Sequence, residues 1–294
     1  MALRRPWVRT CAMRLIHSPS EMREAAESLR RGRPPLGLVP TMGALHEGHR
    51  SLIRRAAEEC GAVAVSIFVN PAQFGPGEDL GRYPRTLEAD LALCEGEGVA
   101  AVYHPSAEAM YPPGFSSWVE VPSLAAGLCG PHRPGHFKGV ATVVLKLFAA
   151  CRPGRAYFGE KDYQQLVIIR RMARDLDLGV EVVGCPTVRE ADGLALSSRN
   201  AYLTAEERPR ALSLIRGLRR AEAMLAGGER ETIYLVAAAR EEMARAGVQP
   251  DYAEVFHPET LAPLDEVEGE ARMAVAARVG RTRLIDNLPL RAGP

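Results

Sequence analysis

One segment near the N-terminus constrains the fold most, because its order of patterns admits few chain paths. An apolar run at residues 36–40 precedes a glycine-containing turn, a helical pattern from about residue 48 to residue 60, and a β-branched apolar run at residues 62–69. A strand, a helix and a second strand buried on both faces make a βαβ unit, with parallel strands and a right-handed crossover. The order therefore predicts an α/β fold built on a parallel sheet.

The same alternation of helical and strand patterns continues toward the C-terminus. After about residue 188 the character changes to charged helices followed by short strands. We therefore expect a Rossmann-like parallel sheet with helices on both faces over residues 13–188, and a smaller α+β lid domain over residues 189–294. The expected helices are 20–31, 85–96, 139–151, 164–176, 205–226 and 229–246, and the further strands are 100–104, 156–158, 180–185, 252–256 and 272–279.

Charge and hydropathy exclude several classes of protein. The 37 basic and 36 acidic residues give a formal net charge of +1, which provides no electrostatic footprint for nucleic acid or an anionic membrane. No stretch reaches the roughly 18 apolar residues of a membrane span. Residues 1–12 are rich in arginine but lack the apolar core of a signal peptide. We expect a disordered extension over residues 1–12, no nucleic-acid or membrane partner, and a cytoplasmic protein with reduced cysteines.

The turn after the first strand carries two histidines three positions apart. The segment P-T-M-G-A-L-H-E-G-H occupies residues 40–49 and places His46 and His49 at the start of the following helix. There, backbone N–H groups and the positive end of the helix dipole attract an anion, and Gly43 and Gly48 let a phosphate approach the backbone. Taken alone, the spacing is also compatible with a zinc-binding pair or with ordinary capping histidines.

Amide and basic side chains follow two further strands. Asn70 and Gln73 come after the strand that ends near residue 69, where neutral amides can donate to a carboxylate or a hydroxyl. Lys161 lies in G-E-K-D after the strand at residues 156–158, and a lysine there can reach phosphate oxygens. Strand-end capping for the amides, and an exposed charge cluster for the lysine, are the competing interpretations.

Two loops contain the other candidate polar residues. Ser197, Ser198 and Arg199 lie in a polar, glycine-containing stretch that is typical of a mobile loop, where they can bind a triphosphate as the loop closes. A helix N-cap followed by an exposed arginine explains the same residues equally well. Arg133 precedes a Pro-Gly turn before an apolar helix, and this pattern is also that of a simple turn with its caps.

Together these motifs resemble those of the pantothenate synthetase family. H-x-G-H after a first parallel strand is typical of the HIGH-type nucleotidyltransferases, and the longer form at residues 40–49 is typical of the pantothenate synthetases among them. The resemblance covers essentially all of residues 13–290. Its other motifs are S-I-F-V-N-P-x-Q-F at 66–74, R-P-G-H-F-x-G-V at 133–140, F-G-E-K-D-Y-Q-Q at 158–165, L-S-S-R-N at 196–200 and T-R-L-I-D at 282–286.

The resemblance implies a set of site residues, and none of them is a metal ligand. The catalytic residues, which are expected to stabilise the phosphates, are His46, His49, Lys161, Ser197, Ser198 and Arg199. The substrate-binding residues are Asn70, Gln73, Arg133 and Gln165. The ATP-binding residues are Pro40, Thr41, Met42, Gly43, Ala44, Leu45, His46, Glu47, Gly48, His49, Gly159, Glu160, Lys161, Asp162, Val188, Leu196, Ser197, Ser198 and Arg199.

The reaction implied by the resemblance is an ATP-dependent ligation. Pantoate is activated as pantoyl adenylate with release of pyrophosphate, and β-alanine then displaces AMP to give pantothenate. Mg²⁺ is expected on the phosphates, and the enzyme is expected to be a homodimer. Family members commonly carry a glutamate before the glycine that leads to R-P-x-H-F, whereas this chain has Cys129. The loop is therefore expected to be held differently, with no catalytic group lost.

Two other classes compete with the ligase interpretation. Another HIGH-type enzyme could transfer AMP to a phosphate ester, but the paired glutamines Gln73 and Gln165 suit a hydroxylated acid instead. A non-catalytic nucleotide sensor would keep the phosphate site but lose some of the residues that stabilise charge. All of those residues are present in this chain. A relative of the aminoacyl-tRNA synthetases is disfavoured, since the near-zero net charge leaves little for RNA.

Overall fold

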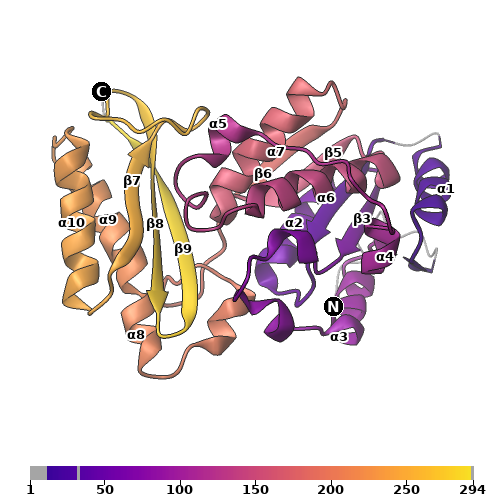
Figure 1. Cartoon of the computed structure of the whole chain (residues 1–294), viewed down its shortest axis with the longest axis horizontal. Coiled ribbons are helices and arrows are strands. Elements are labelled where there is room, and N and C mark those ends of the chain that lie inside the picture. The colour runs from indigo at the N-terminus through magenta and orange to yellow at the C-terminus, as the bar shows by residue number, and fades with distance from the viewer. Residues whose placement is uncertain (1–11, 32–33, 293–294) are drawn as a thin grey trace, which may run out of the picture. The chain divides into compact units, whose positions relative to one another are not determined.

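The computed structural model of the chain describes residues 12–31 and 34–292. These residues form two compact units (Figure 1). All but one residue of the disordered extension expected over residues 1–12 lie outside the described residues, and the boundary near residue 188 stays a prediction. The first unit extends to Glu120 and includes Gly135–Phe158 and Ile169–Cys185, whereas the second includes Val121–Pro134, Gly159–Ile168 and the chain from Pro186 onward.

A six-stranded sheet forms the centre of the first unit, with the strand order β1-β4-β3-β2-β5-β6. The predicted βαβ unit is confirmed, because β2 and β3 pair in parallel with Leu36 opposite Ala62 and Thr41 opposite Ile67. The short edge strand β1 was not predicted. The strands are β1 (Arg14–Ile16), β2 (Leu36–Thr41), β3 (Ala62–Ile67), β4 (Ala101–Tyr103), β5 (Arg155–Gly159) and β6 (Glu181–Cys185).

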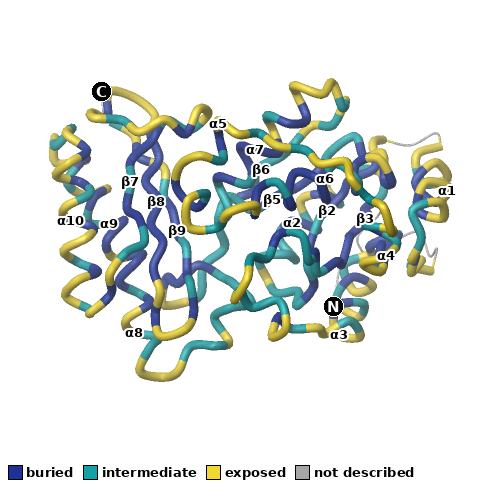
Figure 2. Tube along the Cα trace, in the orientation of Figure 1, coloured by how far each residue is buried: buried dark blue, intermediate teal, exposed yellow. Residues whose placement is uncertain are grey.

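Helices cover this sheet and bury one side of their surface against it (Figure 2). Helix α2 packs Leu52 and Ile53 against Val39 and Val65 of the strands, which explains the spacing of its apolar residues. Helices α1 and α6 contact each other and β2. The helices that begin before residue 186 are α1 (Pro19–Arg30), α2 (Glu47–Glu59), α3 (Leu87–Gly96), α4 (Ala107–Met110), α5 (Pro122–Ala125), α6 (His136–Cys151) and α7 (Tyr163–Asp175).

The connections of the sheet reverse direction between β2 and β5. From β2 the chain passes through α2 to β3 and β4 on one side, and it then returns through α6 to β5 on the other side of β2. Open α/β sheets bind ligands beyond the carboxyl ends of the strands at such a switch point. The turn that starts at Thr41 follows β2, and the short 3₁₀ helix η3 (Glu160–Asp162) follows β5 directly in the sequence.

The second unit contains a three-stranded antiparallel sheet in the order β7-β8-β9, against which α9 and α10 pack (Figure 1). The helix predicted over residues 205–226 is divided at Leu212, and β9 was not predicted as a strand. The elements are α8 (Glu207–Ala211), α9 (Ser213–Ala226), α10 (Thr232–Arg245), β7 (Pro250–Phe256), β8 (Glu270–Val279) and β9 (Thr282–Arg291). The remaining 3₁₀ helices of the chain are η1 (Pro71–Gln73), η2 (Asp79–Arg82) and η4 (Ser198–Tyr202).

The prediction of an α/β fold with a parallel sheet and a smaller C-terminal α+β part is confirmed by these two sheets. In the part of the chain that the structure describes, no helix combines the length and the hydropathy needed to cross a membrane.

Candidate functional site

The turn between β2 and α2 is shaped by hydrogen bonds from its own backbone. Gly43 N–H donates to Thr41 Oγ1 at 3.2 Å, and this hydroxyl donates to Ser66 O at 2.7 Å. Gly43 has a φ of +83°, and a Cβ there would lie 3.0 Å from Asp90 Oδ2. Glycine is therefore favoured at this position, both for the left-handed backbone and for the space.

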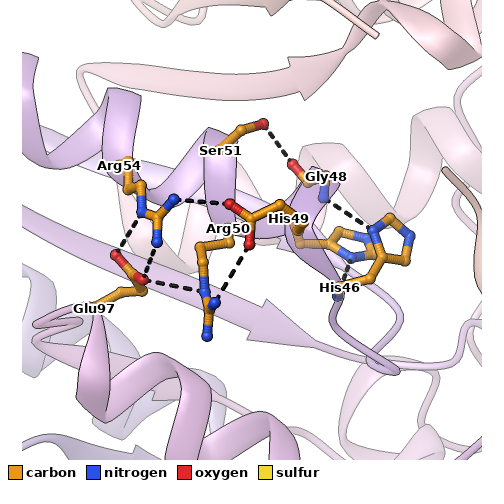
Figure 3. A network of polar contacts seen from close by, with 8 residues as sticks. His46, Gly48, His49, Arg50, Ser51, Arg54 and Glu97 are labelled. Carbon is orange, nitrogen blue, oxygen red and sulfur yellow. Dashed lines mark hydrogen bonds and ion pairs between the residues drawn. The ribbon is translucent and has the colours of Figure 1, made fainter. Parts of the chain in front are cut away.

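His46 and His49 cap helix α2 with their Nδ1 atoms (Figure 3). Gly48 N–H donates to His46 Nδ1 at 3.1 Å, and His46 N–H donates to His49 Nδ1 at 3.3 Å. An Nδ1 that accepts a hydrogen bond carries no proton, so the ring proton of each neutral imidazole lies on Nε2. The ring centroids are 4.1 Å apart. The turn thus holds two adjacent hydrogen-bond donors, Nε2–H of His46 and Nε2–H of His49.

The arginines of α2 form a separate network with carboxylates (Figure 3). Arg54 binds Glu97 through Nε at 3.1 Å and Nη2 at 2.9 Å, and its Nη1 donates to Glu47 at 2.7 Å. Arg50 also pairs with Glu47 at 3.3 Å and with Glu97 at 3.1 Å. The side chain of Glu47 is therefore directed to these arginines, and its contribution to ATP binding stays a prediction.

Asn70 and Gln73 form a buried amide pair at the two ends of η1. Asn70 is 1% exposed, and its Nδ2 donates to Gln73 Oε1 at 3.0 Å and to Gly139 O at 3.2 Å. Its Oδ1 accepts hydrogen bonds from Tyr111 at 2.8 Å and from Ala72 N–H at 3.2 Å. Burial raises the pKa of Tyr111 to about 12, which keeps its hydroxyl a donor. These contacts favour a positioning role for Asn70.

Gln73 is held from two further sides in the first unit. Its Nε2 lies 3.1 Å from Met42 Sδ, and its backbone oxygen lies 2.9 Å from Nδ1 of the buried His136. Met42 belongs to the turn after β2, whereas His136 begins α6. The pair of amides is thereby connected to the histidine turn on one side and to α6 on the other.

In the second unit, strands β8 and β9 hold the turn that contains Lys161. Asn287 Nδ2 donates to Glu160 O and to Lys161 O, both at 2.9 Å, and Arg272 Nη2 donates to Glu160 Oε2 at 2.8 Å. Lys161 Nζ lies 3.5 Å from Asp162 Oδ1. Sequence reasoning missed Asn287 and Arg272, because a polar residue in a strand carries no motif of its own.

The loop with Ser197 and Arg199 is tied to the same sheet. Arg189 binds Asp286 of β9 with two hydrogen bonds, at 2.7 and 2.9 Å. Leu196 N–H donates to Val188 O at 3.0 Å. The hydroxyl of Ser197 caps η4 by accepting from Arg199 N–H at 3.3 Å. The capping interpretation of this serine is therefore confirmed, and its binding of phosphate stays a prediction.

Cys129 lies in a buried polar cluster of the second unit. Its Sγ lies 3.2 Å from Tyr252 Oη and 3.7 Å from Arg283 Nη1, and Arg283 Nε donates to Asp251 at 2.7 Å. Burial raises the pKa of Tyr252 above its usual range. Gln164 Oε1 accepts from Cys129 N–H at 3.0 Å. The loop before Arg133 is therefore held directly by the Cys129 thiol and the Gln164 amide, and the carboxylate of Asp251 joins the cluster through Arg283.

Comparisons with known proteins agree over nearly the whole chain. The family model described as "Pantoate-beta-alanine ligase" matches residues 14–289. The chain belongs to the pantoate–beta-alanine ligase family. "Pantothenate synthetase" of Oleidesulfovibrio alaskensis is 53% identical over 280 residues, which are 95% of this chain and 100% of that protein.

Two solved structures place the fold in the same ligase family. Pantothenate synthetase from Thermus thermophilus has a TM-score of 0.90 at 48% identity, covering 96% of this chain and 100% of that one. The pantoate–beta-alanine ligase from Francisella tularensis, complexed with "Beta-gamma ATP and Beta-alanine", has a TM-score of 0.81 at 34% identity, covering 94% and 97%.

The site residues expected of a ligase in this family are divided between the two units. Pro40, Thr41, Met42, Gly43, Ala44, Leu45, His46, Glu47, Gly48, His49, Asn70 and Gln73 lie in the first unit. Arg133, Gly159, Glu160, Lys161, Asp162, Gln165, Val188, Leu196, Ser197, Ser198 and Arg199 lie in the second. Among the residues described, no three His, Cys, Asp or Glu side chains are grouped to hold a metal ion.

Replacing Asp286 by Asn should loosen the 189–200 loop. Asp286 is 2% exposed, so removing its charge leaves Arg189 with one fewer charged acceptor in a largely dry environment. We expect the free energy of unfolding to fall by about 1–3 kcal/mol, and proteases to cut within the loop faster. Chemical denaturation and limited proteolysis measure these effects. Glu268→Gln removes an exposed carboxylate of the same unit and should change neither.

Proposed function

We propose that the chain condenses (R)-pantoate with β-alanine to form pantothenate at the expense of ATP. The observation that carries this proposal is the family match over residues 14–289, together with the two Nε2–H donors of His46 and His49 beside the switch point of the sheet. The Francisella ligase structure is described as complexed with "Beta-gamma ATP and Beta-alanine", which supports the same pair of ligands here.

The first half-reaction activates the acid. A carboxylate oxygen of pantoate attacks the α-phosphorus of ATP, and the bond from that phosphorus to the α,β-bridging oxygen breaks, so that pyrophosphate leaves and pantoyl adenylate forms. In this proposal His46 and His49 donate hydrogen bonds to the phosphate oxygens, where negative charge builds up in the transition state. Lys161, Ser197, Ser198 and Arg199 are the other residues proposed to bind the phosphates. No covalent enzyme intermediate is required, so the enzyme acts by positioning and charge stabilisation.

The second half-reaction forms the amide. The neutral amine of β-alanine attacks the acyl carbon of pantoyl adenylate, and AMP leaves with one of the original carboxylate oxygens. Gln73 and Gln165 orient the pantoate, and Arg133 binds a substrate carboxylate. Asn70 supports Gln73 by the 3.0 Å hydrogen bond between the two amides. Water must be excluded during this step, because a free adenylate would hydrolyse.

The remaining parts of the proposal concern Mg²⁺, assembly and location. Mg²⁺ fits as a companion of ATP, because Mg²⁺ commonly stays on the phosphate oxygens of a nucleotide and keeps several waters. It would neutralise part of the triphosphate charge. We further propose that the enzyme is a homodimer, as expected from the family resemblance, and that it is cytoplasmic, as expected from its composition.

An isotope experiment tests the proposed reaction. The purified protein is given ATP, Mg²⁺ and pantoate labelled with ¹⁸O in its carboxylate, with and without β-alanine. We expect pyrophosphate release that requires pantoate, AMP release that requires both substrates, and one ¹⁸O in the AMP. Adenylylation of a phosphate ester but not of pantoate would replace the proposal with the rival transferase. Absence of any pyrophosphate release would leave only a nucleotide-binding fold.

A further inference from the structure

Asp90 of α3 makes a buried contact with the histidine turn that no sequence motif indicated. Its Oδ2 accepts from Ala44 N–H at 2.9 Å, and its Oδ1 accepts from Leu45 N–H at 2.8 Å. Thr86 Oγ1 donates to Oδ1 at 3.2 Å. The carboxylate is 2% exposed and lies in the first turn of α3, where the helix dipole favours a negative charge. Each carboxylate oxygen therefore has a backbone partner in the turn.

The turn needs such an anion because of its backbone conformation. Gly43 and Ala44 have φ values of +83° and +50°, so two consecutive residues are left-handed and the second of them is not glycine. Consecutive backbone N–H groups in a turn of this kind converge and form a concave anion site. Here the anion is a side chain of the protein itself. Asp90 thus stabilises a conformation that Ala44 would otherwise rarely adopt.

The same contacts reach the two imidazoles within one residue. Leu45, whose N–H binds Asp90, directly precedes His46, the N-cap of α2. The N–H of His46 binds His49 Nδ1, and the Nδ1 of His46 accepts from Gly48 N–H. A displacement of the turn would therefore change both hydrogen bonds that place the ring protons on Nε2.

We propose that Asp90 is a positioning residue that fixes the histidine turn and thereby the tautomers of His46 and His49. Its importance for the rate rests on the proposed function, whereas its effect on the rings does not. An asparagine does not reproduce these contacts, because its single amide oxygen takes the place of one carboxylate oxygen and its NH₂ then faces the N–H group that the other oxygen bound. One buried backbone donor would then lose its partner.

The decisive variant is Asp90→Asn, compared with Glu88→Gln as a matched control. Glu88 lies in the same first turn of α3 but is exposed, so its variant removes the same charge from the helix terminus without touching the histidine turn. Ring ¹⁵N spectra of the free enzyme distinguish a protonated Nε2 from a protonated Nδ1 for each histidine. We expect single Nε2–H tautomers for His46 and His49 in the wild type and in Glu88→Gln, and mixed tautomers in Asp90→Asn.

Activity is the second readout. We expect kcat for pyrophosphate release to fall between about tenfold and about 100-fold in Asp90→Asn and to stay at the wild-type value in Glu88→Gln. Unchanged ring spectra in a folded Asp90→Asn protein would overturn the proposal, as would equal losses in both variants. If the wild type itself releases no pyrophosphate, the proposed function fails and the ring spectra alone decide the role of Asp90.

A measurement on the wild type covers the case in which Asp90→Asn does not fold. The amide hydrogens of Ala44 and Leu45 should exchange slowly with solvent, because both are bound to the buried carboxylate. Exchange at the rate of an unstructured peptide would contradict the proposal without the use of any variant.

Discussion

Replacing His49 by Asn should slow pyrophosphate release by about 10²–10³-fold while leaving the fold intact. The Oδ1 of an asparagine lies near the position of Nδ1 and can keep accepting from His46 N–H, which His49 now binds at 3.3 Å. The variant loses the Nε2–H donor, which we propose stabilises the charge on the phosphates. His49→Gln should lose less, since the glutamine NH₂ lies near the position of Nε2. Single-turnover kinetics with ATP and pantoate measures both.

His257 provides the matched control for this comparison. Its Nδ1 caps a turn by accepting from Glu259 N–H at 3.2 Å and from Thr260 N–H at 3.3 Å, which is the same chemistry at a position without a proposed role. We expect His257→Asn to retain the wild-type rate. If His49→Asn and His257→Asn lose activity equally, or if His49→Asn retains full activity, the Nε2–H donor of His49 has no part in the reaction.

The sequence predicted the parallel sheet well, because hydrophobic burial dictates its pattern. Strands β2 and β3 are buried on both faces and read as continuous apolar runs, and the helix between them has helical spacing. Strand β9 escaped prediction for the opposite reason. Asp286 and Asn287 are buried within it, with 2% and 4% of their surface exposed, so its apolar alternation is interrupted. Their partners lie far away in the sequence and give no local signal.

The candidate site likewise contains residues that the sequence predicts and residues that only the structure reveals. His46 and His49 could be predicted, because a short motif places two imidazoles at a helix start after a strand. Asp90 could not, because an acidic residue in the first turn of a helix is most simply explained by the helix dipole. Only the fold reveals that its carboxylate accepts from two backbone N–H groups more than forty residues earlier. Asp90, which binds the turn, therefore lies outside the sequence motif at residues 40–49 by which the turn is recognised.

Gly139 lies where α6 and η1 are in close contact, so its substitution should affect substrate binding. A Cβ there would lie 2.2 Å from Ala72 O and 2.7 Å from Gln73 N, and no rotamer can relieve a clash with backbone atoms. In Gly139→Ala the helix and η1 must separate, which strains the bond from Asn70 to Gly139 O and the contact of His136 with Gln73 O. The free energy of unfolding should fall by about 1–3 kcal/mol.

The same separation should displace Gln73, which we propose orients the pantoate. We expect kcat/KM for pantoate to fall about 100-fold in Gly139→Ala, with a larger rise in KM for pantoate than for ATP. Gly96→Ala is the matched control, because Gly96 is also helical and its Cβ would meet nothing within 4 Å. In that variant the free energy of unfolding should rise by up to about 1 kcal/mol, and kcat/KM for pantoate should stay at the wild-type value. A folded Gly139→Ala enzyme with unchanged kcat/KM for pantoate would mean that Gln73 does not contact this substrate, since its displacement is imposed by the backbone.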